Sequence, residues 1–321
     1  MAIGAIDIGG TKTITAILSD SGEILVSRYF PTVSNDWYEH FTLTAKYFET
    51  CYEMYKTQTF GKDPLVGVGI NVPGMADNIN GILLYAPHQN WHDVPVRDFF
   101  RSALSIQNVQ VENDVNACAL GEMVFGGGGA DFLWLTISTG NGGAIVANSK
   151  LIRGSSNCAG EFGHLKVEFE NPRLCACGQR GCLESQSSGT AIKEIFLETM
   201  NGNPGFLSQV KIFEKKNRDF KRDASGLALL ANEGNLTARA LYHDVGKYLG
   251  RAISYGLNIS NPEKVYLGGG VAQSMQLFLP ALLNEIDRSV VPGAKKVEIC
   301  ETKLGYNAAL LGAGALVKLN V

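Results

Sequence analysis

A group of cysteine and histidine side chains lies close together in the sequence between residues 161 and 185. In the order C-x-C-x4-C, with a histidine eleven positions upstream, these residues are His164, Cys175, Cys177 and Cys182. Thiolate and imidazole suit tetrahedral zinc, and four protein ligands without water describe a structural site. Gly178 and Gly181 permit the tight turns that would bring three sulfurs to one ion. The alternative is three reduced cysteines in an ordinary loop, but the ligand chemistry favours zinc.

Two glutamates lie beside these candidate ligands. Glu161 precedes His164 by three residues, and Glu184 follows Cys182 by two. A metal that ties His164 to Cys182 would also fix the two carboxylates relative to each other. Rigid acceptors next to an imidazole suit the hydroxyl groups of a sugar. The alternative is two solvated glutamates, the usual environment of this residue, but their position beside the metal favours ligand binding.

Glycine-rich turns follow several apolar runs. The first follows the predicted strand 3–8 and precedes the predicted strand 14–18, and residues 20–22 predict a hairpin turn after it. Because this turn joins two antiparallel strands and opens no helix, the G-x4-G-K-[ST] phosphate loop is excluded. The same strand–turn–strand pattern recurs at 132–147, which indicates two domains of related architecture.

These turns are candidate phosphate-binding sites. Backbone N–H groups and a threonine hydroxyl can bind phosphate oxygens, and an aspartate nearby can hold hydrated Mg²⁺. Plain β-hairpins are the alternative, but two copies plus a third cluster after the predicted strand 265–267 favour phosphate contact. The candidates are Asp7, Gly9, Gly10, Thr11, Lys12, Thr139, Gly140, Gly142, Gly143, Gly268, Gly269 and Gly270.

Asn113 and Asp114 stand where a predicted strand (109–111) meets a predicted helix (115–123). One interpretation is an ordinary helix N-cap, for which asparagine and aspartate are favoured. The other is that Asp114 takes the proton from an alcohol that attacks the γ-phosphorus of a nucleotide. The two are compatible, since a capping position would also hold the side chain still.

Hydrophobic periodicity outlines the elements that must position these residues. Residues 75–91 are rich in Asn, Gly and Pro and are expected to form an irregular loop. A buried strand is expected at 65–72 and another at 297–299. Helices are expected at 36–56, 94–103, 191–230 with an interruption at 201–205, 237–257, 275–290 and 307–317.

Composition restricts the class of protein. The 321 residues suffice for two domains, and 45% hydrophobic with 18% charged residues describes a globular protein with a well-filled core. A net charge of −3 gives no basic surface for nucleic acid. The first residues carry no basic segment of a signal peptide, and no apolar run reaches the length of about 18 residues that indicates a membrane span. We therefore expect a cytoplasmic protein without membrane or nucleic-acid partners.

The combined motifs resemble the ROK family (repressors, open reading frames and kinases) of the actin/hexokinase-like superfamily. The motifs are D-I-G-G-T-K at 7–12, E-N-D-V-N at 112–116, T-G-N-G-G at 139–143, A-G-E-F-G-H at 159–164, C-A-C-G-Q-R-G-C-L-E at 175–184 and L-G-G-G-V at 267–271. The resemblance covers essentially the whole chain. It implies two α/β domains of the actin/hexokinase-like (ribonuclease H-like) fold, which close over ATP-Mg²⁺ and a hexose. The smaller domain would comprise 1–115 plus 306–321, and the larger, with the zinc loop, 116–305.

The resemblance also implies residue roles. Asp114 would be the catalytic base, and His164 would be both zinc ligand and sugar contact. The sugar would be bound by Asn113, Asp114, Glu161, His164 and Glu184. A homodimer or a tetramer is expected. Two features depart from the family pattern: Asn141 replaces a residue that is often aliphatic, and the interior of 75–93 indicates no particular sugar.

The main expectation is an ATP-dependent hexokinase that phosphorylates a 6-hydroxyl group, with glucose as the first candidate. Fructose, mannose, allose, N-acetylmannosamine and β-glucosides are the alternatives, because few pocket residues decide such preferences. A sugar-responsive repressor would carry a helix-turn-helix domain ahead of the first glycine motif, and the first strand already begins at Ile3. A catalytically idle sugar sensor would be expected to lack Asp7 or Asp114, and both are present.

Overall fold

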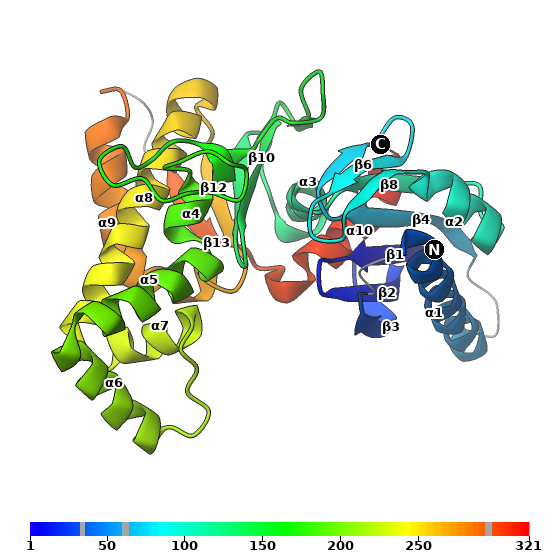
Figure 1. The fold of residues 1–321 in the computed structure, drawn as a ribbon. Coiled ribbons are helices and arrows are strands. Elements are labelled where there is room, and N and C mark those ends of the chain that lie inside the picture. Colours follow the sequence, from blue (N-terminus) through cyan, green and yellow to red (C-terminus); the bar gives the residue numbers. More distant parts are fainter. Residues whose placement is uncertain (33–35, 60–63, 293–296, 321) are drawn as a thin grey trace. The chain divides into compact units, whose positions relative to one another are not determined.

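The computed structural model describes residues 1–32, 36–59, 64–292 and 297–320. By its internal contacts the chain divides into two compact units (Figure 1). Unit 1 comprises Met1–Ala130, Asn148–Ala159 and Thr302–Val321, and unit 2 comprises Asp131–Ala147 and Gly160–Glu301. The domains expected from the sequence also include residues 33–35, 60–63, 293–296 and 321, which lie outside the described residues.

Unit 1 is built on a mixed five-stranded sheet. In spatial order its strands are β3 (Ile24–Pro31), β2 (Lys12–Ser19), β1 (Ala2–Ile8), β4 (Leu65–Val72) and β8 (Val109–Asn113). β1 and β2 form the antiparallel hairpin predicted around the first glycine turn. β1, β4 and β8 are mutually parallel, so their carboxyl ends lie at one edge of the sheet.

Alternating side chains of these strands bury both faces of the sheet. Ile6 and Ile8 face a core shared with α1 (Trp37–Thr59) and α2 (Val96–Leu104). Ile3 and Ala5 face the opposite core, which is shared with α10 (Ala308–Leu319).

Close backbone approaches bring α10 onto the sheet and onto α3 (Asp114–Gly121). A Cβ added to Gly69 of β4 would lie 1.7 Å from the carbonyl oxygen of Ala313, and one added to Gly312 would lie 2.0 Å from that of Ala117. Only glycine fits such approaches. As a result α3 belongs to unit 1, whereas the sequence-based division assigns residues from 116 onwards to the larger domain. A single π-helical turn (Glu122–Gly126) follows α3, so the α-helix ends earlier than the predicted 115–123.

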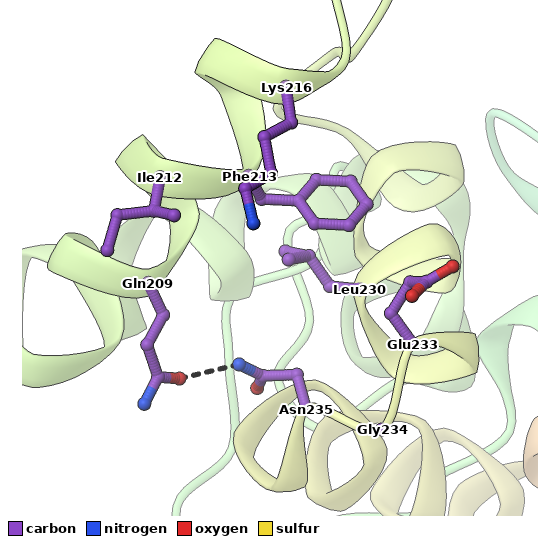
Figure 2. A pocket seen from close by; sticks show the side chains of 8 residues that line it. All are labelled: Gln209, Ile212, Phe213, Lys216, Leu230, Glu233, Gly234 and Asn235. Atoms are coloured by element: carbon purple, nitrogen blue, oxygen red, sulfur yellow. Dashed lines mark hydrogen bonds between the residues drawn. The ribbon is translucent and has the colours of Figure 1, made fainter.

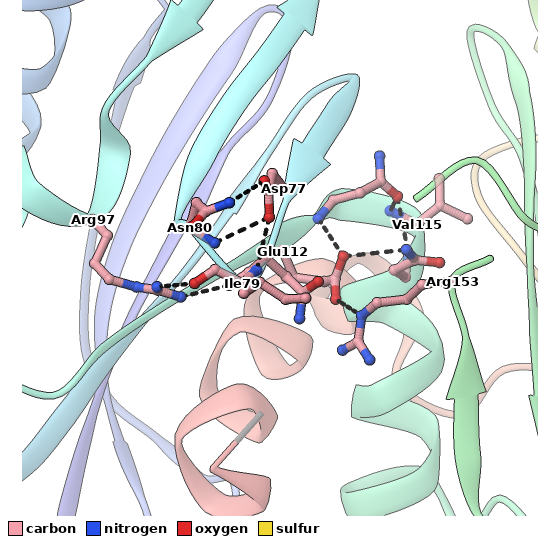
Figure 3. Close-up of polar contacts among 10 residues, drawn as sticks. Asp77, Ile79, Asn80, Arg97, Glu112, Val115 and Arg153 are labelled. Carbon is pink, nitrogen blue, oxygen red and sulfur yellow. Dashed lines mark hydrogen bonds and ion pairs between the residues drawn. The ribbon is translucent and has the colours of Figure 1, made fainter. Parts of the chain in front are cut away.

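The expectation of an irregular loop at 75–91 is wrong. This segment forms a three-stranded antiparallel sheet of β5 (Met75–Asp77), β6 (Ile82–Ala86) and β7 (Trp91–Val94). Asp77 accepts hydrogen bonds from the backbone N–H groups of Ile79 and Asn80, and this closes the first turn (Figure 3). The guanidinium group of Arg97 donates to the carbonyl oxygens of Asn78 and Ile79. These strands are too short to give a clear hydrophobic alternation, and their first turn is stabilised by Arg97, which lies outside the segment.

Unit 2 contains four neighbouring strands of a second mixed sheet, in the order β10 (Asn141–Ala147), β9 (Phe132–Ile137), β12 (Lys264–Gly268) and β13 (Glu298–Glu301). β9 and β10 are antiparallel, which confirms the predicted repeat of the strand–turn–strand pattern. The predicted helical segments are present as α5 (Gly189–Gly202), α6 (Pro204–Lys216), α7 (Ala224–Asn232), α8 (Leu236–Ser260) and α9 (Met275–Ser289). Within the described residues, no helix combines the length and apolar character needed to cross a membrane.

Candidate metal centre and ligand-binding residues

The structure brings the four candidate metal ligands together in unit 2. One ligand atom from each of His164, Cys175, Cys177 and Cys182 lies within 4.8 Å of the others. The sulfurs of Cys177 and Cys182 are 3.8 Å apart, and Cys175 Sγ lies 3.8 Å from His164 Nδ1. Ligands bound at about 2.3 Å around a tetrahedral ion are separated by about 3.8 Å. The cluster therefore fits zinc in both chemistry and size.

Glycine geometry allows this loop to fold. Gly178 and Gly181 adopt φ of 82° and 75°, in the left-handed region that glycine readily adopts in the tight turns expected here. A Cβ at Gly181 would lie 2.1 Å from the carbonyl oxygen of Glu168, so no larger residue fits there. Tyr248 and Arg251 of α8 fasten the loop: the hydroxyl of Tyr248 donates to Glu168 at 3.0 Å, and the guanidinium group of Arg251 donates to the carbonyl of Val167 at 2.6 Å.

The two glutamates predicted to accompany the cluster lie near His164 and near each other. Burial raises the pKa of the Glu161 carboxyl, the negative charge of Glu184 raises it further, and the imidazole of His164 opposes both effects. Glu184 lies on α4 (Leu183–Ser187), which begins directly after Cys182. Carboxylates and an imidazole are thus grouped beside the metal ligands, as the sugar-binding hypothesis requires.

The second glycine turn, 139–143, packs against Glu184. The backbone N–H of Asn141 donates to Glu184 Oε2 at 3.1 Å, and a Cβ at Gly140 would lie 2.5 Å from the same oxygen. The third glycine cluster adjoins the end of β9, because Gly269 (φ 92°) lies against Ile137 and the N–H of Val271 donates to the Ile137 carbonyl at 3.0 Å. Two of the three predicted phosphate motifs therefore lie at the same end of β9.

The first glycine turn lies in unit 1, where Gly10, Thr11 and Lys12 are exposed. Two of its carbonyl oxygens accept hydrogen bonds from side chains of unit 1. The hydroxyl of Thr32 donates to the Gly9 carbonyl at 2.8 Å, and the side-chain amide of Gln89 donates to the Gly10 carbonyl at 3.2 Å. This arrangement leaves the exposed side of the turn for a ligand.

A buried hydrogen-bond chain behind this turn has a fixed direction. Because Thr32 donates to Gly9, its oxygen must accept from Thr13 Oγ1, 3.0 Å away, and Thr13 must in turn accept from His40 Nε2 at 2.9 Å. His40 therefore carries its proton on Nε2. Burial lowers the pKa of His40 to about 4, which keeps the ring neutral. Sequence reasoning missed Thr13, Thr32 and His40, because His40 lies on the apolar face of a helix and resembles a core residue.

Asp7 lies near the carboxyl end of β1, opposite Asn71 in the parallel ladder with β4. Burial and, to a smaller extent, the negative charge of Asp114 raise its pKa to about 7, against the opposing effects of Lys12 and of a hydrogen bond from Asn71. Asp7 and Asp114 therefore share one electrostatic site. Two carboxylates beside an exposed turn suit a hydrated divalent cation.

Asn113, not Asp114, is the N-cap of α3. Its side-chain oxygen accepts from the N–H groups of Val115 and Asn116 at 2.9 and 3.0 Å, and its amide donates to the Gly74 carbonyl at 2.7 Å. Asp114 is the first helical residue, and its Oδ1 accepts from the Val115 N–H and from the Asn113 amide. The carboxylate is thus oriented without serving as the cap.

A buried ion pair supports this corner (Figure 3). Glu112 Oε2 lies 2.7 Å from Nε of Arg153, and the Glu112 side chain is only 2% exposed. The other carboxylate oxygen accepts from the N–H of Asn113 and from the side-chain amide of Asn116. The E-N-D-V-N motif therefore combines an anchor, a cap, a candidate base and a supporting amide. The roles of Glu112, Asn116 and Arg153 were not predicted from the sequence.

A cavity of about 260 Å³ lies elsewhere in unit 2, between α6, α7 and the segment 233–235 that precedes α8 (Figure 2). Phe213 and Leu230 line it, and the side-chain amide of Asn235 donates across it to Gln209 at 2.6 Å. None of the predicted site residues contributes to its lining. This cavity is therefore separate from the candidate metal ligands and the candidate ligand-binding residues.

Comparison with known proteins identifies relatives along the whole chain. The family model described as "ROK family" matches residues 3–320. A glucokinase of Halalkalibacterium halodurans is 32% identical over 316 residues, which cover 98% of this chain and 94% of the relative. A glucokinase of Thermotoga maritima is also 32% identical, with 98% and 96% covered. A xylose repressor of Bacillus spizizenii is 32% identical over 256 residues, which cover 79% of this chain and 61% of the repressor.

Solved structures show the same fold. A ROK family glucokinase from Streptomyces griseus, in complex with glucose and AMPPNP, superposes with a TM-score of 0.80 at 26% identity, covering 99% of this chain and 100% of that one. A ROK hexokinase from Thermus thermophilus gives a TM-score of 0.78 at 27% identity, covering 100% and 99%. The expected two-domain actin/hexokinase-like α/β fold is thereby confirmed, and the chain belongs to the ROK family.

Proposed function

We propose that this protein is an ATP-dependent hexokinase that transfers the γ-phosphate to the 6-hydroxyl of a hexose, with glucose as the first candidate. The observation that carries the proposal is the pair Asp7 and Asp114. Each lies at the carboxyl edge of the parallel strands of unit 1, one beside an exposed glycine turn and the other at a helix N-terminus. Two glucokinases at 32% identity support the same reaction class.

Asp114 is proposed as the general base. Its carboxylate accepts hydrogen bonds from the Asn113 amide and the Val115 N–H, which orient it at the N-terminus of α3. As the sugar oxygen bonds to the γ-phosphorus, the bond from that phosphorus to the bridging oxygen of ADP breaks, and the hydroxyl proton moves to Asp114. A positioned base of this kind contributes about 10²- to 10⁴-fold to rate.

The nucleotide phosphates are proposed to contact the glycine motifs. Thr11 and Lys12 are exposed on the first turn and supply a hydroxyl and a positive charge. Asp7 would hold hydrated Mg²⁺, which when bound neutralises charge on the phosphates. The remaining proposed contacts are Gly9, Gly10, Thr139, Gly140, Gly142, Gly143, Gly268, Gly269 and Gly270.

The sugar is proposed to contact Asn113, Asp114, Glu161, His164 and Glu184. Zinc held by His164 and the three cysteines would supply rigidity, because the loop that it closes carries the sugar-binding residues of unit 2. A contact with two roles, His164, would then link metal and sugar. We propose that the protein works as a homodimer or a tetramer.

A sugar-responsive regulator is the second candidate, because xylose repressors are among the relatives. The matched region covers 61% of the repressor from Bacillus spizizenii, so that protein contains sequence that this chain does not match. An idle sensor of the same family is a further form of this candidate. The retention of both Asp7 and Asp114 supports the kinase.

ATP consumption by the purified protein, measured against hexoses, N-acetylhexosamines and β-glucosides, tests the proposal. Asp114→Asn is measured in parallel. One sugar should drive turnover in the wild type, and Asp114→Asn should abolish it. If a sugar raises the melting temperature without driving turnover, the protein is a sensor or regulator and not a kinase. Asp114 would then be a ligand contact only.

A further inference from the structure

Asn141 connects the second glycine turn to α4 through two different groups. Its backbone N–H donates to Glu184 Oε2 at 3.1 Å, and its side-chain amide donates to Ser187 Oγ at 2.7 Å. Glu184 and Ser187 are three residues apart on α4 and therefore lie on one face of that helix. One residue of the turn thus holds this face at two points.

The orientation of the Asn141 amide is fixed by its partner. The Ser187 hydroxyl donates to the carbonyl of Leu183 at 3.0 Å, so toward Asn141 it can only accept. The amide nitrogen of Asn141 must therefore face Ser187. The amide oxygen is buried without a hydrogen-bond partner among the described residues. A buried unpaired oxygen costs free energy, so an aliphatic residue would fit this position better if packing were its only role.

α4 needs external support. It has five residues, and Cys182 at its N-cap position provides no side-chain cap. Helices this short are unstable alone in water. Their orientation must come from tertiary contacts, and Cys182, in the metal cluster, holds only the beginning of α4.

We propose that Asn141 is a positioning residue that fixes the carboxylate of Glu184 for sugar binding. The glycine turn and Glu184 then form one rigid unit, in which Gly140 leaves room for the carboxylate. The role of Glu184 rests on the proposed function, whereas the link between Asn141 and α4 does not. This assigns a role to the position at which the chain departs from the family pattern.

Asn141→Leu, Ser187→Ala and the double variant test this inference, with Asn258→Leu as the control. Far along the chain from α4, the Asn258 amide donates to the carbonyl of Ser289 and its oxygen accepts from the N–H of Val291, so this control makes the same chemical change and removes one more hydrogen bond than Asn141→Leu does. Steady-state kinetics give KM for the sugar, KM for ATP and kcat, with the sugar that drives turnover in the panel. Hydrogen–deuterium exchange of residues 183–188 reports the order of α4 in the absence of any ligand.

Asn141→Leu removes the hydrogen bond to Ser187 and keeps the backbone N–H that contacts Glu184. Because α4 then loses one of its two attachments to the turn and the Glu184 carboxylate is less well fixed, the sugar KM should rise about five- to tenfold. The ATP KM and kcat should stay within about twofold, because a merely destabilised enzyme loses active fraction, and hence kcat, without a change in KM. Ser187→Ala should also raise the sugar KM. The double variant should have the same sugar KM as Asn141→Leu, since both substitutions remove the same hydrogen bond between Asn141 and Ser187. Exchange in 183–188 should become faster in Asn141→Leu and remain unchanged in Asn258→Leu.

An unchanged sugar KM in Asn141→Leu would overturn the inference, as would a rise in the ATP KM alone. If no sugar drives turnover in the wild type, the proposed function fails. Hydrogen–deuterium exchange then tests the link between Asn141 and α4 by itself. Faster exchange in 183–188 would still show that Asn141 orders α4 and Glu184. Unchanged exchange would refute that link as well.

Discussion

The side-chain amide of Asn113 donates a hydrogen bond to its neighbour Asp114, with Nδ2 3.0 Å from Oδ1. The same asparagine caps α3 through its oxygen. The capping role therefore belongs to Asn113 and not to Asp114, the proposed base. Substitution of the cap should disturb both stability and the proposed base, and the two effects are separable.

Asn113→Ala should lower the free energy of unfolding by about 1–2 kcal/mol, because the N–H of Asn116 loses its capping acceptor and that of Val115 loses one of two. It should also lower kcat/KM, since Asp114 loses its donor. Asn113→Asp restores a cap oxygen and should recover most of the stability. It should not recover activity, because an aspartate cannot donate to Asp114 and adds a like charge. Urea unfolding and kinetics of the three proteins check this, and equal recovery of both quantities in Asn113→Asp would contradict it.

The raised pKa of Asp7 predicts a pH-dependent stability. The carboxyl titrates near 3.8 in the unfolded chain and near 7 in the folded protein. Between these two pH values the folded state binds more protons than the unfolded state. The free energy of unfolding should therefore fall as pH rises from about 4 to about 7, by at most about 1.4 kcal/mol per pH unit. The positive charge of Lys12 and the negative charge of Asp114 act on the pKa of Asp7 in opposite directions.

Asp7→Asn cannot ionise and should lack this slope. The free energy of unfolding of the variant minus that of the wild type should increase from pH 4 to pH 7 and then level off, because only the wild type loses stability in this range. Urea unfolding at half-unit pH intervals measures it, with Asp98→Asn in α2, at another carboxyl of unit 1, as the control. A difference that is constant with pH would show that Asp7 is ionised in the folded protein well below pH 7.

Local sequence features predicted the metal loop and the glycine hairpins well, because spacing carries their chemistry. Three cysteines with interspersed glycines allow few folds around one ion, and Gly178 and Gly181 adopt the backbone angles that this requires. The helices follow from periodicity in the same way. Such signals lie within a few residues of each other and need no knowledge of tertiary contacts.

The supporting residues could not be predicted because their roles come from long-range contacts. Arg153 meets Glu112 from 41 positions along the chain, and His40 reaches Thr13 over 27. The strands at 75–94 were missed for a similar reason, since Arg97 closes their turn from outside the segment. Each of these residues is common in unrelated roles, and only the fold shows which role applies.

Metal removal should affect sugar binding before it affects unit 1. A chelator that strips the cluster should lower the melting temperature and weaken sugar binding by at least about tenfold, since Glu184 lies two residues after Cys182. Cys177→Ser, at an exposed ligand, should do the same, whereas Cys300→Ser, on β13, should not. Metal content by elemental analysis and sugar titration by calorimetry measure both effects. Full sugar affinity in a metal-free protein would refute the coupling.

Arg153→Met should destabilise unit 1 more than the loss of an exposed pair does. Its partner Glu112 is 2% exposed at the side chain, so removal of the cation leaves a buried carboxylate. Breaking a buried pair costs about 3–5 kcal/mol, and the 20% exposure of Arg153 places this case toward the lower value. Lys56→Met, which breaks an exposed pair with Glu53, should cost about 0–1 kcal/mol.

The double variant Arg153→Met with Glu112→Gln shows whether the unpaired charge is the cause. It should be more stable than Arg153→Met alone, because glutamine keeps a side-chain oxygen for the Asn113 N–H and the Asn116 amide without a buried charge. Urea unfolding of the four proteins supplies the comparison. A double variant that is less stable than Arg153→Met would contradict this. It would mean that the hydrogen bonds of the charged Glu112 carboxylate stabilise the protein even without Arg153.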